Sequence, residues 1–189
     1  MFIDLSVKVT VQSNREAAEN EKMVSFGHLG THFDVMDKEF PLPFLKRDAV
    51  VFDVRNVKDR DIGTGDADLS LVEEGMFAAF YTGFIDGVPY GTREYFTAHP
   101  QLSNELIEAL LEKKVSIIGV DFAGVRRGAE HTPMDRRCAE RGAFVVENLC
   151  NLDKVLSGRK TAGFTAYTFP VNFAGLTGLP CRVAAEVCD

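Results

Sequence analysis

The run His28-Leu29-Gly30-Thr31-His32-Phe33-Asp34 contains two of the four histidines in the chain, four residues apart, with an aspartate two residues further on. If the backbone turns at Gly30, two imidazoles and one carboxylate come within reach of a single divalent ion. Such ligands suit Zn, Mn or Fe better than Ca or Mg, and the lack of a nearby cysteine argues against a closed structural zinc site. The pattern predicts that His28, His32 and Asp34 bind a metal with an open position for water. The alternative is that both histidines are ordinary loop or helix residues.

The composition of the whole chain favours a single cytoplasmic domain. Its 189 residues, 46% of them hydrophobic, can bury one sizeable core, so we expect one domain over residues 1–189. The formal net charge of -7 argues against a nucleic-acid partner or an anionic membrane surface, because both require a basic patch. No apolar run approaches the roughly 20 residues that span a bilayer. The start, Met1-Phe2-Ile3-Asp4-Leu5-Ser6, lacks the features of a signal peptide, and the four cysteines show no CxxC spacing, so we expect reduced thiols.

The hydrophobic patterns predict a mixed α/β fold with a large β content. Apolar and polar residues alternate from Ile3 to Val11, as in a half-buried strand, and the polar stretch from Asn14 to Lys22 predicts a helical turn or a loop. Further short strands are expected at Ala49 to Val54, Met76 to Tyr81, Val115 to Val120, Ala143 to Val146, Phe164 to Phe169 and Arg182 to Val187. Helices are expected from Asn104 to Lys113, capped by Ser103, and from Pro133 to Arg141, capped by Thr132.

The histidine motif and several shorter segments resemble the cyclase family of metal-dependent hydrolases, which includes bacterial kynurenine formamidase and isatin hydrolase. The hallmark of that family is His-x-Gly-Thr-His-x-Asp, and this chain matches it at every fixed position between His28 and Asp34. Shorter similarities follow in the same order along almost the whole chain: Phe2-Ile3-Asp4-Leu5-Ser6, Tyr81-Thr82-Gly83-Phe84, Gly119-Val120-Asp121, Glu147-Asn148-Leu149-Cys150-Asn151-Leu152 and Pro180-Cys181-Arg182-Val183.

The resemblance implies a swivelling β/β/α fold, one or two divalent ions such as Zn or Mn, and hydrolysis of an amide or lactam next to an aromatic ring. It also implies that Glu147 is a metal ligand together with His28, His32 and Asp34. From the sequence alone, Glu147 could instead be a solvated or salt-bridged residue. Family members are commonly oligomeric, so a homo-oligomer is expected.

Lys38 is the first departure from the family pattern. Typical members follow the motif aspartate with Ala-Pro-x-His, and that histidine accepts a proton; here the run is Val35-Met36-Asp37-Lys38. Lys38 is either a solvent-facing side chain or a catalytic group. Beside a divalent cation, repulsion and desolvation would favour its neutral amine, which could act as a base or steady an oxyanion.

The second departure concerns a downstream histidine that the family places near the start of the helix before Glu147. Its spacing falls on Asp135, which could be a metal ligand or part of a capping box. His131 lies just before that cap and could bring its imidazole to the metal instead; we rank it slightly above Asp135, and both above Glu130. His99 has no acid or histidine at ligand spacing and is expected to be a loop residue.

Phe33 and Phe84 could line a pocket for an aryl group, although most of the 15 phenylalanines must belong to the core. The leading hypothesis is an arylformamidase-like hydrolase, in which metal-activated water cleaves the C–N bond of an aryl formamide such as N-formylkynurenine, or of a cyclic amide. Its partner would be a small-molecule substrate. The alternative is a member that kept the scaffold, binds a metal or small molecule and has lost turnover, as the missing base histidine suggests.

Overall fold

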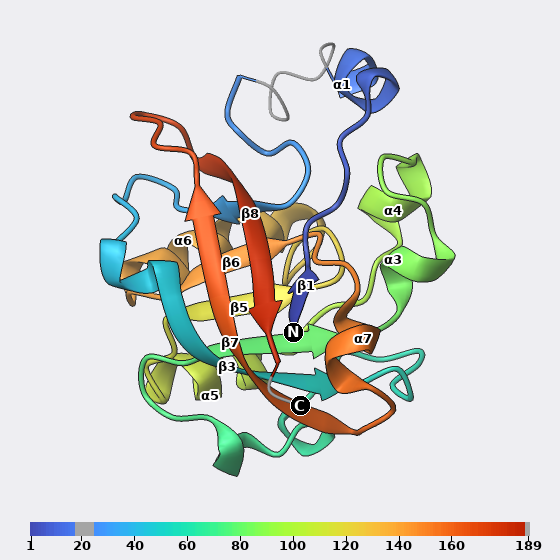
Figure 1. Cartoon of the computed structure of the whole chain (residues 1–189), viewed down its shortest axis with the longest axis vertical. Helices are drawn as coiled ribbons and strands as arrows, with labels where there is room; N and C mark the ends of the chain where they lie inside the picture. Colours follow the sequence, from blue (N-terminus) through green and yellow to red (C-terminus); the bar gives the residue numbers. More distant parts are fainter. Residues whose placement is uncertain (18–24, 188–189) are drawn as a thin grey trace.

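The computed structural model describes residues 1–17 and 25–187 (Figure 1). Its strands are β1 Phe2–Asp4, β2 His32–Asp34, β3 Lys46–Asp53, β4 Phe77–Tyr81, β5 Ile117–Val120, β6 Phe144–Glu147, β7 Thr161–Pro170 and β8 Gly178–Glu186. Its helices are α1 Val11–Ala17, α3 Phe84–Gly87, α4 Arg93–Thr97, α5 Asn104–Glu112, α6 His131–Glu140 and α7 Leu152–Leu156. Short 3-10 turns lie at η1 Leu42–Leu45, η2 Thr64–Asp66, η3 Leu69–Leu71 and η4 Gly128–Glu130.

Seven strands close into a barrel. The hydrogen-bonded order runs β8-β2-β6-β5-β4-β3-β7, and β7 returns to β8 by antiparallel pairing from Thr165↔Glu186 to Pro170↔Cys181. The segment β3-β4-β5-β6 is parallel, whereas β2 runs antiparallel to both β6 and β8. β1 pairs with β8 at residues 184–186, beyond the end of β2. This closed arrangement leaves few free strand edges and holds the short strand β2 between two partners.

Alternate residues of the barrel strands point to opposite faces and form two cores. The inward set fills the barrel with apolar side chains, including Phe33, Val51, Phe77, Val146 and Phe164. The outward set on the parallel strands packs against α5, and it includes Val50, Ala78, Ile118, Leu106 and Leu110. α6 lies along β6 on the same outer face. The mixed α/β fold with a large β content, predicted from the sequence, is therefore confirmed.

Most predicted elements coincide with observed ones. The helix predicted from Asn104 is α5, and the Ser103 hydroxyl accepts a hydrogen bond from the Leu106 N–H at 3.2 Å, as expected of its cap. The strand predicted from Ile3 to Val11 is wrong beyond Asp4, where β1 ends. Thr10 and Ser13 exchange hydrogen bonds between hydroxyls and backbone N–H groups, and this reciprocal cap starts α1 at Val11 instead. Of the polar stretch from Asn14 to Lys22, residues 18–22 lie outside the described residues.

The second predicted helix begins earlier than its sequence suggests. α6 starts at His131, with Glu130 rather than Thr132 at the N-cap, and no side-chain cap bond is present there. The reason is that η4 runs directly into α6, so the chain is already coiled when it reaches Thr132. Pro133 is tolerated because the first N–H groups of a helix have no partner within it. The earlier start puts His131 on the helix itself, one turn before Asp135.

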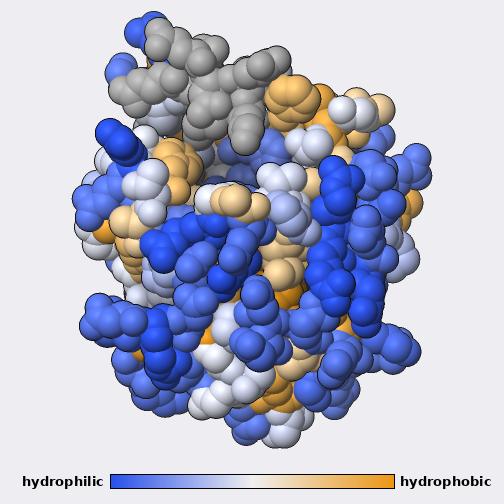
Figure 2. Space-filling model, turned by 180° about the vertical axis from the view of Figure 1, so that it is seen from behind, coloured by the Kyte–Doolittle hydropathy of each residue, from blue (hydrophilic) through white to orange (hydrophobic). Residues whose placement is uncertain are grey.

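One face of the molecule is largely hydrophilic. Figure 2 shows a face on which hydrophilic side chains predominate and apolar ones form small separated patches. Within the described part of the chain, no helix is both long and apolar enough to cross a bilayer.

We predict that Gly119→Ala destabilises the barrel. A Cβ at Gly119, on β5, would overlap the ring of Phe77 and approach the Leu149 methyl group to 2.7 Å, inside a filled core. Overpacking of this kind typically costs about 1 to 3 kcal/mol. Gly163→Ala is the matched control, because Gly163 also lies in a strand but its Cβ would meet only the Ala49 carbonyl oxygen at 3.8 Å. Urea unfolding of both variants measures the difference; equal stabilities would contradict the packing described here.

Candidate metal centre

Strand β2 presents His32 and Asp34 of the motif on the outside of the barrel. His32 and Asp34 are two residues apart in a strand, so their side chains share one face, while Phe33 between them points inward. Phe33 is completely buried and packs on Phe40, with ring centroids 4.7 Å apart, within the interior core. The predicted role of Phe33 in binding an aryl substrate is therefore not supported, because the strand alternation puts it on the face opposite the two ligand candidates.

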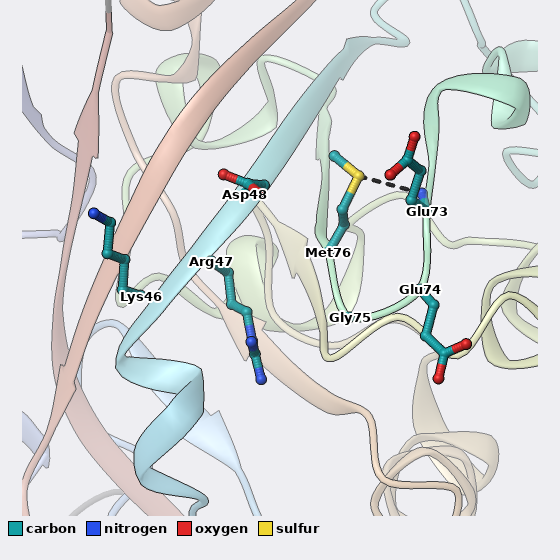
Figure 3. A pocket seen from close by; sticks show the side chains of 7 residues that line it. All are labelled: Lys46, Arg47, Asp48, Glu73, Glu74, Gly75 and Met76. Carbon is teal, nitrogen blue, oxygen red and sulfur yellow. Dashed lines mark hydrogen bonds between the residues drawn. The ribbon is translucent and has the colours of Figure 1, made fainter.

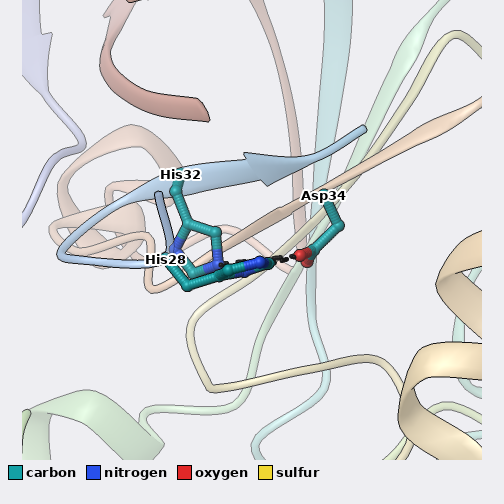
Figure 4. A group of neighbouring side chains, drawn as sticks. All are labelled: His28, His32 and Asp34. Atoms are coloured by element: carbon teal, nitrogen blue, oxygen red, sulfur yellow. Dashed lines mark hydrogen bonds and ion pairs between the residues drawn. The ribbon is translucent and has the colours of Figure 1, made fainter. Parts of the chain in front are cut away.

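His28 reaches the same place from the turn before β2. Its Nδ1 lies 3.0 Å from Asp34 Oδ1 and 3.1 Å from His32 Nε2, so the three side chains converge (Figure 4). Gly30 has φ of 74°, as the predicted turn requires. Gly27 has φ of 84°, and a Cβ there would collide with the carbonyl of Gly178. The motif thus turns at Gly30 as expected, and a second position that requires glycine, Gly27, directly precedes it.

Neighbouring groups fix the orientation of both imidazoles. His28 Nε2 lies 2.8 Å from the Thr177 hydroxyl, and His32 Nδ1 lies 2.9 Å from the Gly30 carbonyl oxygen, to which it can donate. The same carbonyl accepts a hydrogen bond from the Asn148 amide at 2.8 Å. With these nitrogens engaged, His28 Nδ1 and His32 Nε2 remain free to face Asp34. Outer contacts of this kind set the tautomer and orientation of metal-binding histidines.

The groups that orient the two imidazoles form a second layer around the candidate ligands. Two tyrosines complete this second layer. The Tyr95 hydroxyl donates to Asn148 Oδ1 at 2.9 Å, and the N–H of Gly30 donates to the Tyr90 hydroxyl at 2.7 Å. Sequence reasoning missed Thr177, Asn148 and both tyrosines as parts of the site. Only Asn148 had a signal, because it follows Glu147 in one of the segments that resemble the family.

β6 and α6 supply the other half of the site. The antiparallel register pairs His32 with Glu147, whose Oε2 lies 3.5 Å from His32 Nε2. On α6, His131 and Asp135 are four residues apart and therefore share one helix face. His131 Nε2 lies 3.2 Å from Glu147 Oε1 and 3.1 Å from Asp135 Oδ2. The structure thus brings both alternatives for the downstream ligand to the site, whereas Glu130 pairs with Arg126 instead.

We call this group the six-residue cluster, and it has two ends that share Asp34. Potential ligand atoms within 4.8 Å of one another form two sets. The histidine end comprises His28, His32 and Asp34. The carboxylate end comprises Asp34, His131, Asp135 and Glu147.

Most carboxylate oxygens of the cluster are buried without a hydrogen-bond partner. Both oxygens of Asp34, both oxygens of Asp135 and Oε1 of Glu147 make no hydrogen bond, although all are inaccessible to solvent. Burial and the charge of Asp34 raise the pKa of Asp135 to about 6 and that of Glu147 well above its usual range. Orphaned buried oxygens next to imidazole nitrogens are what an absent cation would satisfy, so these residues fit a divalent metal.

His131 and Asp34 carry the compensating charges within the cluster. Burial disfavours the charged form of His131, but contacts with Asp135 and Glu147 outweigh this effect and raise its pKa to about 11. Burial likewise opposes ionisation of Asp34, yet the close approach of His28 Nδ1, at 3.0 Å, and the charge of His32 lower its pKa to about 2. The cluster therefore attracts positive charge strongly, and one protonated histidine balances only part of it.

Lys38 lies apart from the cluster. Its side chain is 42% exposed, and its ammonium group lies 3.3 Å from Asp37 Oδ1. Among the described residues no contact joins it to the six-residue cluster. The catalytic assignment of Lys38 stays a prediction, without support from this geometry.

Phe84 belongs to an aromatic group beside the second layer. Asp121 accepts hydrogen bonds from the Thr82 N–H, the Thr82 hydroxyl and the Gly83 N–H, and this fixes the turn that leads into Phe84. Phe84 is partly buried and packs against Tyr95, with centroids 5.6 Å apart. Its contact with a substrate stays a prediction, although Tyr95 links it to the cluster through Asn148.

Two surface hollows differ in their relation to the cluster. One of about 300 Å³ is lined by Lys46, Arg47, Asp48, Glu73, Glu74, Gly75 and Met76 (Figure 3). It lies where β3 and β4 begin, so it faces the end of the parallel strands opposite to Glu147. The other, of about 550 Å³, is lined partly by Phe96 and by Gly128–Glu130, the turn that ends at His131. No residue of the six-residue cluster lines either hollow, but the lining of the second one ends at the residue before His131.

His99 is a loop residue, as expected, but it is buried. Its ring stacks on Phe122 with centroids 5.5 Å apart, and its Nδ1 lies 2.7 Å from the Pro100 carbonyl oxygen. Burial lowers the pKa of His99 to about 4, although the hydrogen bond to Pro100 favours the charged form. It is the one histidine outside the six-residue cluster.

The chain is similar to proteins of known family and fold. A family model described as "Putative cyclase" matches residues 3–126, and none of the curated proteins matches significantly. A structure described as a potential metal-dependent hydrolase with cyclase activity aligns with a TM-score of 0.74 at 20% identity, over 98% of this chain and 96% of its own. A predicted metal-dependent hydrolase from Bacillus stearothermophilus gives 0.72 at 20% identity, over 98% and 97%. Isatin hydrolase A from Ralstonia solanacearum gives 0.70 at 19% identity, over 98% and 91%. At these identities the likeness establishes the fold.

We expect Thr177→Val to weaken metal binding by about tenfold, because loss of a second-layer partner of a ligating histidine typically costs 10- to 100-fold in affinity. Valine keeps the size and shape of threonine but cannot hydrogen-bond to His28 Nε2. Thr165→Val, on β7, is the matched control and should bind as the parent does. Isothermal titration with Zn²⁺ compares the three proteins; an unchanged dissociation constant for Thr177→Val would contradict the positioning role.

His99→Gln should make the protein less sensitive to acid. His99 has a pKa near 4 when folded and about 6.5 when unfolded, so between these values the unfolded chain binds more protons and the free energy of unfolding falls as the pH falls. From pH 7 to pH 5 this contribution is about 2 kcal/mol. Urea unfolding at both pH values should show the parent losing about 2 kcal/mol more than His99→Gln. Equal losses would indicate that His99 is protonated in the folded protein.

Proposed function

This chain belongs to the cyclase family, and from that premise we propose that it is a metal-dependent hydrolase of amide C–N bonds in small aromatic molecules. The observation that supports the proposal most directly is the convergence of three histidines and three buried carboxylates. They come from the turn before β2, from β2 itself, and from β6 and α6. Hydrolases that use metal-activated water need such a donor set with one side open to substrate.

The ligands in this proposal are His28, His32, Asp34, His131, Asp135 and Glu147. Together they would hold one or two divalent ions, Zn or Mn by their donor types. A bound ion of this class lowers the pKa of water to about 7 and polarises a carbonyl oxygen. Asp34 belongs to both ends of the cluster, so it is the residue that would connect two ions.

Exposure indicates from which side a substrate would approach. The side chains of His28 and His131 are 22% and 34% exposed, whereas those of His32 and Glu147 are at most 4% exposed. The open side of the cluster therefore lies between His28 and His131. The substrate carbonyl would enter there, while the barrel and α6 exclude water from the buried oxygens.

Aromatic side chains near this opening favour an aromatic substrate. Phe96 is 37% exposed, lines the larger hollow and packs edge-on against Tyr90 and Tyr95, and Tyr90 in turn accepts the hydrogen bond from Gly30. An aryl group could rest on such a surface with its amide directed toward His131. An aryl formamide such as N-formylkynurenine, or a cyclic amide such as isatin, has this shape. The similarity in fold to isatin hydrolases supports the second choice.

The test combines metal analysis with a substrate screen. We expect the purified protein to bind Zn²⁺ or Mn²⁺ and to hydrolyse at least one formyl-aniline, N-formylkynurenine or isatin. A hundredfold excess of metal over the dissociation constant should stabilise the folded state by about 2.7 kcal/mol. His32→Ala should abolish both this shift and turnover, because it removes a buried ligand candidate at the centre of the cluster.

Two further outcomes separate the alternatives. Metal binding without turnover of any amide, ester or lactam would identify a binding protein that has lost catalysis. Lys38→Ala should keep the metal affinity, because its ammonium group lies at the surface beside Asp37. Loss of turnover in Lys38→Ala at unchanged affinity would place Lys38 in proton transfer.

A further inference from the structure

The two ends of the six-residue cluster offer different ligand atoms. We propose that they prefer different divalent cations, a zinc-type ion at the histidine end and a harder, manganese-type ion at the carboxylate end. This inference deepens the proposed function and rests on it for the metal itself. It concerns only which ion each end selects.

The histidine end provides two nitrogens and one carboxylate. His28 Nδ1 and His32 Nε2 lie 3.1 Å apart and both approach Asp34 Oδ1, at 3.0 and 3.8 Å (Figure 4). Their other ring nitrogens are already engaged by Thr177 and the Gly30 carbonyl, so the orientation of both rings is set before any ion binds. Two imidazoles with one carboxylate form a donor set typical of catalytic zinc.

The carboxylate end is rich in oxygen. Asp34, Asp135 and Glu147 contribute carboxylates, and His131 contributes the single nitrogen. His131 Nε2 lies 3.1 Å from Asp135 Oδ2 and 3.2 Å from Glu147 Oε1, so all these atoms face one small volume. Both oxygens of Asp135 lack a hydrogen-bond partner although the side chain is fully buried. Carboxylate ligands favour hard ions such as Mn²⁺ over softer ones.

Asp135 is the residue that makes the two ends unequal. It lies on the inner face of α6, and its one ion pair among residues 1–17 and 25–187 is with His131, one turn earlier on the same helix. A histidine at this position would give the carboxylate end two nitrogens, as at the histidine end. The choice of aspartate at residue 135 therefore sets the cation preference of that end.

Charge balance is compatible with one or two cations in the cluster. The three carboxylates carry three negative charges when ionised, so one divalent cation leaves one buried negative charge uncompensated. A second cation gives the centre a net positive charge, which attracts the oxygen of a polarised carbonyl group.

The experiment titrates the metal-free protein with Zn²⁺ and Mn²⁺, separately and together. Calorimetry and metal analysis give the stoichiometry and affinities, and electron paramagnetic resonance reports bound Mn²⁺. Zn²⁺ binds most protein sites more tightly than Mn²⁺, so the decisive quantity is the ratio of their affinities at each end. We expect this ratio to be smaller at the carboxylate end by on the order of tenfold. One equivalent of Zn²⁺ should therefore leave Mn²⁺ bound at the second position.

Variants at residue 135 test the cause. Asp135→His should raise the Zn²⁺ to Mn²⁺ ratio at the carboxylate end, so that a second equivalent of Zn²⁺ displaces Mn²⁺. Asp135→Asn keeps the size and one oxygen donor but removes the charge, and it should weaken both ions while leaving the ratio near that of the parent. Asp48→His, at an exposed position on β3, is the matched control and should change neither affinity.

The outcomes are distinct from those of the activity screen. Equal ratios at the two ends, or an unchanged ratio in Asp135→His, would overturn the inference even if the protein hydrolyses an amide. If Asp135→His does not fold, the parent titration and Asp135→Asn still decide the question. Unequal ends in a protein without turnover would contradict the proposed hydrolase activity alone.

Discussion

The pairing of β2 with β6, in the register that sets His32 opposite Glu147, supports both the barrel and the candidate metal centre. β2 is only three residues long, yet it closes the ring of strands between β6 and β8. Because side chains alternate between the faces of a strand, a slip of one residue would turn Phe33 outward and bury His32 and Asp34 in the barrel. The apolar interior therefore enforces the same register that the ligands require.

The centre is assembled at a cost in stability. Asp34, Asp135 and Glu147 are buried next to one another, and the partners available to them are mainly three histidines. Buried carboxylates without full compensation destabilise a fold, so the barrel and α6 must supply the difference through packing. A bound cation would remove this penalty. Metal binding at this candidate centre would therefore be linked to the stability of the native state.

A small number of groups orient the candidate ligand histidines through hydrogen bonds. Gly30 turns the backbone between the two motif histidines, and its carbonyl oxygen receives hydrogen bonds from both His32 and Asn148. Asn148 directly follows Glu147, so one short segment carries a ligand candidate and the group that orients another. Thr177 acts on His28 from the loop before β8. Segments distant in the sequence therefore supply both the candidate ligands and the groups that orient them.

The sequence by itself determined the metal-binding motif, the alternation that makes the barrel strands and the capped helix α5, because each depends on residues close together in the chain. It left open whether His131 or Asp135 reaches the site, and it offered Phe33 as a residue of a substrate pocket, although that side chain packs in the barrel interior. Those questions depended on where α6 begins and on which face of β2 is buried. Both are set by contacts with distant segments: η4 starts the helix at His131, and the barrel core draws Phe33 inward. The chemistry of the motif was therefore local, whereas the composition of the complete centre was decided by tertiary packing.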